Sequence, residues 1–132
     1  MVIPYARQSI SKLDLNAVAE VLQSDYLTQG PVVPAFEEAI AHLVAARFAV
    51  AGNSATSMLH IACLALGVTT GDLVWTSPIS FVASANCALY CGAEIDFVDI
   101  DSETFNMSPV ALAAKLELAK KSNKLPKVII PV

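Results

Sequence analysis

The hydrophobic residues of the first third of the chain recur at helical spacing. They do so over residues 11–22 and again over residues 36–44. Ser11 is suited to cap the first of these segments, because a serine hydroxyl can accept a hydrogen bond from a free N–H of the first turn. The pair Gly30–Pro31 interrupts the pattern between them, so we predict two separate helices.

From residue 48 onward, short apolar runs alternate with helical patterns. The runs predict strands at 48–52, 73–76, 94–100 and 128–132. The helical patterns between them cover about 55–66, 81–90 and 108–121. Strands that alternate with helices of this length predict a parallel sheet with helices on both faces. The last run reaches Val132 without a following helix to cover it, so we expect this chain to be a piece of a longer protein.

Composition and charge narrow the classes of function. Hydrophobic residues make up 55% of the 132 residues and charged residues 15%, so most of the chain is expected to be buried on both faces of a sheet or covered by a partner. The net charge is −4 and most basic residues lie between Lys115 and Lys127, which disfavours nucleic-acid binding. The sequence has no apolar run of bilayer length and no secretory signal, so we expect no membrane contact. The three cysteines are an odd number, which suits a reducing compartment better than a set of disulfides, and we expect a cytoplasmic protein.

The segment Gly52–Ser57 joins the first predicted strand to the long helix that follows. Small residues at a helix N-terminus leave backbone N–H groups free, and the helix dipole adds partial positive charge there. This arrangement suits a phosphate group, although plain capping by Asn53 or Ser54 explains the same residues. The motifs G-x-G-x-x-G, G-K-S/T and G-x-S-x-G do not occur, which disfavours a dinucleotide dehydrogenase, a P-loop enzyme and a nucleophile-elbow hydrolase.

Two aromatic residues lie in or just after the second predicted strand. Trp75 lies inside the strand and is expected in the core, whereas Phe81 begins a helix just after the strand's carboxyl end. The Phe81 ring could lie over a planar ligand or pack against the protein, and its position leaves both possibilities open.

Three other groups of residues could hold a metal ion. They are the pair His60 and Cys63, the pair Cys87 and Cys91, and the acidic cluster Asp96, Asp99, Asp101 and Glu103. Each pair is half of a metal site at best, so buried thiols are the favoured interpretation of the cysteines. A solvated turn is the favoured interpretation of the acidic cluster, since a cation needs convergent oxygen ligands.

Several motifs in order resemble the DegT/DnrJ/EryC1/StrS aminotransferase family. They are Leu27–Pro31 followed by Phe36–Glu37, then Asn53–His60, Gly71–Asn86 and Val98–Asp101. The resemblance covers essentially the whole chain. It implies an α/β fold with three α/β/α layers and a mainly parallel sheet. The chain would be the incomplete N-terminal part of the large domain of a fold-type I transferase that uses pyridoxal phosphate (PLP). Residues 1–47 would be a helical segment with a substrate loop, and residues 48–132 the first part of the PLP-binding domain.

The same resemblance implies an activity and a set of site residues. The activity is PLP-dependent amination of the 4-keto carbon of a UDP-linked 6-deoxy-N-acetyl amino sugar, with glutamate as amino donor, in a homodimer. Ala55 and Thr56 would hold the PLP phosphate, and Phe81 would stack on the pyridine ring. The nucleotide-sugar would contact Tyr5 and the loop Asp25, Tyr26, Leu27 and Thr28.

Transamination with PLP also needs a lysine and an acid that this chain lacks. The lysine binds the cofactor covalently and moves the proton, and the acid holds the pyridinium nitrogen. In the family both lie farther along the chain, and the six lysines present here have the pattern of exposed helix or loop charges. We therefore expect residues 1–132 alone to be inactive and unstable, with strand 48–52 lacking its neighbour. Two alternatives stay open: a PLP-dependent sugar dehydratase of the same family, which has histidine in place of the lysine, and a small non-catalytic α/β phosphate-binding module.

Overall fold

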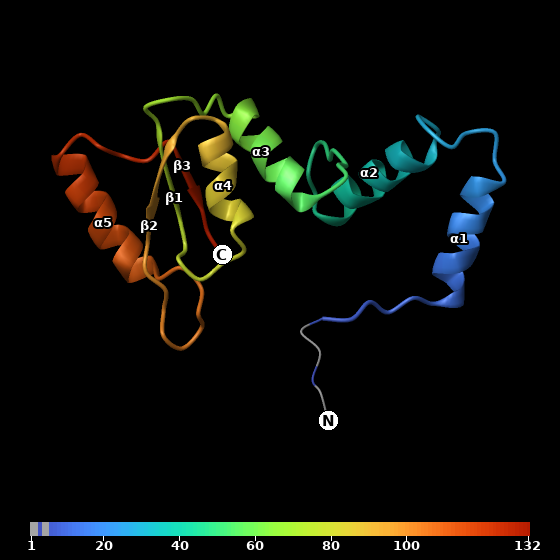
Figure 1. Ribbon diagram of the computed structural model, residues 1–132, viewed down its shortest axis with the longest axis horizontal. Helices are drawn as coiled ribbons and strands as arrows, with labels where there is room; N and C mark the ends of the chain where they lie inside the picture. The colour runs from blue at the N-terminus through green and yellow to red at the C-terminus, as the bar shows by residue number, and fades with distance from the viewer. Residues whose placement is uncertain (1–2, 4–5) are drawn as a thin grey trace. The chain divides into compact units, whose positions relative to one another are not determined.

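The computed structural model of the chain describes residue 3 and residues 6–132, which divide into two compact units, Met1–Ala51 and Gly52–Val132. The first unit contains the two predicted helices, α1 (Lys12–Leu22) and α2 (Val32–Leu43) (Figure 1). Ser11 caps α1 as predicted: its hydroxyl accepts from the Asp14 N–H at 3.3 Å, and the Asp14 carboxylate accepts from the Ser11 N–H at 2.7 Å. The functional division at residue 47 stays a prediction.

The predicted strand at 48–52 is wrong. These residues form no strand, and the Phe48 and Val50 side chains are 74% and 71% exposed. The Ala51 N–H donates instead to the Glu37 carboxylate at 2.8 Å. An apolar run becomes a strand only where another strand pairs with its backbone, and no strand among the described residues does so here.

The second unit is built on a parallel sheet, as the alternation of strands and helices predicted. Its strands are β1 (Leu73–Thr76), β2 (Glu94–Phe97) and β3 (Val128–Ile130), in the spatial order β2-β1-β3 with both pairs parallel. The strand predicted over 94–100 stops at Phe97, and Ile100 forms a single antiparallel bridge with Met107. The short strands therefore leave their carboxyl ends, and the loops that follow them, on one edge of the sheet.

Helices cover both faces of this sheet. Alternate residues of β1 separate the two sides, since Val74 packs with Cys63 and Cys87, whereas Trp75 packs with Val98 and Ala119. The helices are α3 (Ala55–Ala65), α4 (Ala83–Tyr90) and α5 (Pro109–Lys121). Figure 1 shows α3 and α4 on one side of the sheet and α5 on the other. The second unit thus has three α/β/α layers, and Trp75, which is 2% exposed, lies in its core as predicted.

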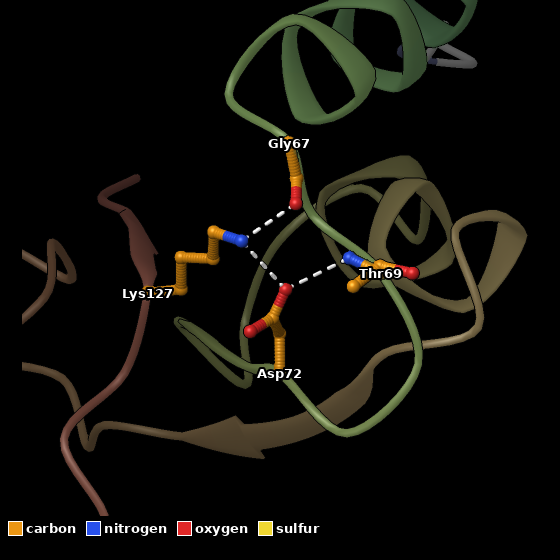
Figure 2. A network of polar contacts seen from close by, with 4 residues as sticks. All are labelled: Gly67, Thr69, Asp72 and Lys127. Atoms are coloured by element: carbon orange, nitrogen blue, oxygen red, sulfur yellow. Dashed lines mark hydrogen bonds and ion pairs between the residues drawn. The ribbon is translucent and has the colours of Figure 1, made fainter.

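Two lysines that were predicted as exposed charges each form an ion pair with an acidic residue. Figure 2 shows the Lys127 ammonium between Asp72, at 2.9 Å, and the Gly67 carbonyl, at 2.6 Å. The same Asp72 oxygen accepts from the Thr69 N–H at 2.8 Å, so this network ties the entry of β1 to the entry of β3.

Lys127 is exposed as predicted, whereas Lys115 is only half-exposed, with 26% of its side-chain surface open to water. Its ammonium lies 2.7 Å from the Asp96 carboxylate and 4.8 Å from the centre of the Trp75 ring. Both contacts hold α5 against the sheet. Periodicity along a helix shows which residues can face water, but it does not show which neighbouring element brings an acid to them.

Candidate functional site

The first turn of α3 presents two backbone N–H groups without a helix partner. The Ser54 hydroxyl accepts from the Ser57 N–H at 3.1 Å, and the Ser54 carbonyl accepts from the Met58 N–H at 3.1 Å. The remaining N–H groups of the first turn belong to Ala55 and Thr56, which have no carbonyl one turn earlier to bond. Capping and anion binding therefore use different donors, and the two interpretations left open by the sequence are compatible.

Gly52 allows the loop to approach this turn closely. A Cβ atom at Gly52 would overlap the side chain of Met58, which lies on the first turn of α3. A residue with a side chain at this position would require the Met58 side chain to move aside. Together with the helix dipole, this geometry supports a site for a phosphate group at Ala55 and Thr56.

Phe81 lies in the loop between β1 and α4. The residue is 74% exposed, so its ring is not part of the core of the second unit. Of the two possibilities that the sequence left open, packing of the ring against the protein is therefore not observed among the described residues. The ring borders a hollow of about 160 Å³, to which Thr76 and Ser77 contribute from the end of β1 and Phe97 from the end of β2. An exposed ring beside a hollow at the carboxyl end of parallel strands is placed where ligands of open α/β sheets bind.

Hydroxyl groups line the same hollow, and the sequence analysis did not single them out. Thr76 and Ser77 are buried, and the Thr76 hydroxyl donates to the Ile130 carbonyl at 3.0 Å. The hydroxyls of Ser80 and Ser84 are 3.1 Å apart. Their position in the sequence could have identified them. Polar residues at the carboxyl end of a buried strand lie at the edge of the sheet where ligands bind.

The structure brings together most of the predicted substrate loop in the first unit. Tyr26, Leu27 and Thr28 border a hollow of about 190 Å³, in a turn where the Ser24 hydroxyl accepts from the Tyr26 N–H at 3.3 Å. Asp25 belongs to the same turn but does not border the hollow. The predicted contact of Tyr5 lies outside the described residues. No hydrogen bond within residue 3 and residues 6–132 joins Phe81 to Ala55 or Thr56, so each feature is defined by its own neighbours.

Several of the candidate metal ligands make packing contacts or turn hydrogen bonds. Cys63 and Cys87 are buried in the core as predicted, and burial raises the pKa of the Cys63 thiol to about 11. The His60 ring packs edge-on against the Tyr90 ring, 5.3 Å between centres. Asp101 accepts hydrogen bonds from the N–H groups of the two turn residues Glu103 and Thr104, which lower its pKa. Within the described part of the chain no three His, Cys, Asp or Glu residues converge on a common point.

The helices give no sign of a membrane segment. Over residue 3 and residues 6–132, no helix combines the length and the apolar character that crossing a bilayer requires.

The chain is an α/β protein with a serine-capped helix start and an exposed aromatic ring at the carboxyl end of a parallel strand. Residues 8–132 match the DegT/DnrJ/EryC1/StrS aminotransferase family. Because the match covers nearly the whole chain, the protein belongs to this family, a family of enzymes whose cofactor is pyridoxal phosphate.

Two bacterial proteins are similar to most of the chain. The chain is 43% identical over 112 residues to the spore coat polysaccharide biosynthesis protein SpsC of Bacillus subtilis (strain 168), which covers 85% of this chain and 29% of that protein. It is 40% identical over 114 residues to the UDP-4-amino-4,6-dideoxy-N-acetyl-beta-L-altrosamine transaminase of Campylobacter jejuni, which covers 86% of this chain and 30% of that enzyme.

A solved structure confirms the fold. The chain resembles Helicobacter pylori PseC, an aminotransferase involved in the biosynthesis of pseudoaminic acid, with a TM-score of 0.84 and 34% identity over 97% of this chain and 33% of that chain. The chain therefore spans about a third of the length of the relatives that it matches. The α/β fold predicted as the partial large domain of a PLP-dependent transferase is confirmed.

Proposed function

We propose that this chain supplies the phosphate-binding helix and the ring-stacking residue of a PLP-dependent sugar aminotransferase. The observation that carries the proposal is the pair of N–H groups at Ala55 and Thr56, which have no hydrogen-bond partner among the described residues and lie inside the region that matches the family. A phosphate dianion takes up such donors readily, and the positive end of the α3 dipole favours its charge. The exposed Phe81 ring fits a flat aromatic ring of the cofactor's size.

The residues of this chain bind and orient, and the cofactor supplies the reactivity. When bound, PLP acts as the electron sink that lets an amino group pass between an amino acid and a keto sugar. Ala55 and Thr56 fix the phosphate end, and Phe81 limits the tilt of the ring, which keeps the reacting carbon in one position. The proton-transferring lysine and the acid for the ring nitrogen are not among the residues described here, so no proton transfer is assigned to this chain.

For the substrate we propose a UDP-linked 4-keto-6-deoxy-N-acetyl amino sugar, with glutamate as the amino donor. The Campylobacter transaminase and the Helicobacter structure support a role in pseudaminic acid synthesis. Tyr5 and the loop Asp25, Tyr26, Leu27 and Thr28 would contact the nucleotide-sugar, and the hollow beside that loop in the first unit is consistent with this role. We further propose that the whole protein acts in the cytoplasm as a homodimer.

Amino transfer from glutamate tests the activity directly. The protein expressed from its own gene is incubated with PLP, glutamate and the UDP-4-keto sugar, and both products are followed by mass spectrometry. We expect one 2-oxoglutarate for each amino sugar formed. A sugar that loses a hydroxyl group without any 2-oxoglutarate would establish the dehydratase instead, and the absence of either product together with no bound PLP would refute the proposal.

A charge placed at Thr56 tests the phosphate site. Thr56→Glu puts a carboxylate where the phosphate would lie, and we expect PLP affinity to fall by at least about 100-fold from like-charge repulsion. A carboxylate in the first turn stabilises a helix, so unfolding of α3 does not explain such a loss. Thr56→Val is the matched control: it removes only the hydroxyl, keeps the backbone N–H, and is expected to weaken binding about ten-fold or less. Equal affinities of Thr56→Glu and the unchanged protein would place the phosphate elsewhere.

A further inference from the structure

The start of α4 lacks the side-chain cap that most helices have. Its N-cap position is Val82, whose side chain cannot accept a hydrogen bond, and Phe81 comes directly before it. A helix start without a cap frays more easily, because its first N–H groups gain little by staying ordered. The exposed ring that the proposed cofactor site uses therefore sits beside a turn that needs support from elsewhere.

Ser84 supplies that support on both sides of Phe81. Its N–H donates to the Phe81 carbonyl at 3.0 Å, and its hydroxyl lies 3.1 Å from the hydroxyl of Ser80, the residue before Phe81. The Ser84 side chain is only 7% exposed, so water competes little for this bond. One residue thus holds both the carbonyl of Phe81 and the residue that precedes it.

Ser84 is itself fixed to the core. The Cys87 thiol donates to the Ser84 carbonyl at 3.4 Å, and Cys87 is 1% exposed in the cluster that α4 shares with α3 and the sheet. The bond between Ser80 and Ser84 therefore connects the loop that carries Phe81 to a rigid part of the molecule.

We infer that Ser84, through its hydroxyl bond to Ser80, is a positioning residue that holds the Phe81 ring in place for the cofactor. This inference rests on the proposed function, since it needs Phe81 to stack on the cofactor ring. Holding the ring before binding removes the cost of ordering it at the moment of binding, which raises affinity.

Calorimetric titration with pyridoxamine 5′-phosphate tests the inference. This amino form of the cofactor makes no covalent bond to a lysine, so its affinity reports the ring and phosphate contacts alone. In the protein expressed from its own gene, we expect Ser84→Ala and Ser80→Ala each to weaken binding by about three- to ten-fold, the usual effect of one neutral hydrogen bond. The double variant is expected to be no weaker than Ser80→Ala alone, because Ser80→Ala already breaks the bond to Ser84 as well as the longer bond, 3.5 Å, from the Ser80 hydroxyl to the Phe81 carbonyl. Additive losses, or no loss, would overturn the inference.

Two further variants separate positioning from stability and from the proposed function. Val68→Ala weakens the same core cluster without removing a bond of Ser84 or Ser80, and we expect it to lower the melting temperature while the affinity stays unchanged. An equal loss of affinity in Val68→Ala would reduce Ser84 to a structural role. Phe81→Ala is expected to weaken binding about ten-fold. If Phe81→Ala has no effect, the proposed stacking itself fails, whereas an effect of Phe81→Ala without one of Ser84→Ala refutes only the inference about Ser84.

Discussion

Gly92 ends α4 in a backbone conformation that only glycine adopts without strain. Its replacement is expected to lower the free energy of unfolding for two reasons, one conformational and one steric. The residue has φ +75°, and its N–H donates to the Leu89 carbonyl at 2.9 Å. A Cβ at Gly92 would lie 2.6 Å from the Thr70 hydroxyl oxygen. Gly71 has a similar backbone, φ +89°, with nothing within 4 Å of its would-be Cβ. The two glycines therefore share the conformational cost and differ in the steric one.

The expected destabilisation follows from these two parts. Alanine in the left-handed region costs about 1 kcal/mol, which is the whole expected effect of Gly71→Ala. At Gly92 the new methyl group also displaces the Thr70 side chain, whose β-branch restricts its rotation, and this adds about 1 to 2 kcal/mol. We therefore expect Gly92→Ala to lower the free energy of unfolding by about 2 to 3 kcal/mol.

Urea titration followed by circular dichroism measures both variants in the protein expressed from its own gene. Thr70→Ala is the matched partner, because it removes the oxygen that the new methyl group meets. The pair Gly92→Ala and Thr70→Ala should show a favourable coupling of about 1 kcal/mol or more when combined. Equal losses for Gly92→Ala and Gly71→Ala, with no coupling to Thr70, would refute the steric argument, and a neutral Gly71→Ala would refute the conformational one.

Three other changes test the packing and the charges of the second unit by the same titration. Val74→Ala in the core should cost about 2 kcal/mol, whereas Val110→Ala, at an 81% exposed position, should change stability by less than about 0.5 kcal/mol; similar losses would contradict the described core. Trp75→Phe removes a buried indole N–H that has no partner among the described residues, so we expect a change within about 1 kcal/mol, and a larger loss would mean that the N–H has a partner. The hydrogen bond from Lys127 holds the pKa of Asp72 below its ordinary value of 3.8. The stability that this ion pair contributes is therefore complete above pH 3.8 and is lost as the pH falls through the lower folded pKa. Asp72→Asn should reduce the dependence of unfolding free energy on pH in this acid range, and an unchanged dependence would argue against the ion pair.

The elements that the sequence predicted correctly are those whose signals are local. Ser11 caps α1 with its own side chain, and the helical pattern over 108–121 corresponds to α5. The alternation of strands and helices was enough to predict the parallel sheet, since short crossovers allow few other arrangements.

The elements that it missed depend on partners distant in the chain. Residues 48–52 have the apolar pattern of a strand, but β structure also needs a paired backbone, which a period along one segment cannot supply. The ion pairs of Lys115 and Lys127 were not predicted, because their partners, Asp96 and Asp72, lie 19 and 55 residues away. The hydroxyl pair of Ser80 and Ser84 was missed for a different reason, since it is local but has no sequence signature beyond the small residues common in any loop.

The predicted phosphate contacts and the predicted substrate loop differ in how far local chemistry determines them. The phosphate contacts depend on one helix start, because Ser54 takes the Ser57 N–H and leaves the donors of Ala55 and Thr56 available. The cap is a local signal, which is why the sequence alone indicated this place for a phosphate, and the site stays a prediction. The predicted substrate loop is a turn of the first unit, where Tyr26, Leu27 and Thr28 border a hollow. We expect affinity for the cofactor phosphate to withstand changes in the 25–28 loop, whereas selectivity for the sugar should not. Measuring both quantities in a Tyr26→Ala variant would show whether the two sets of contacts are independent.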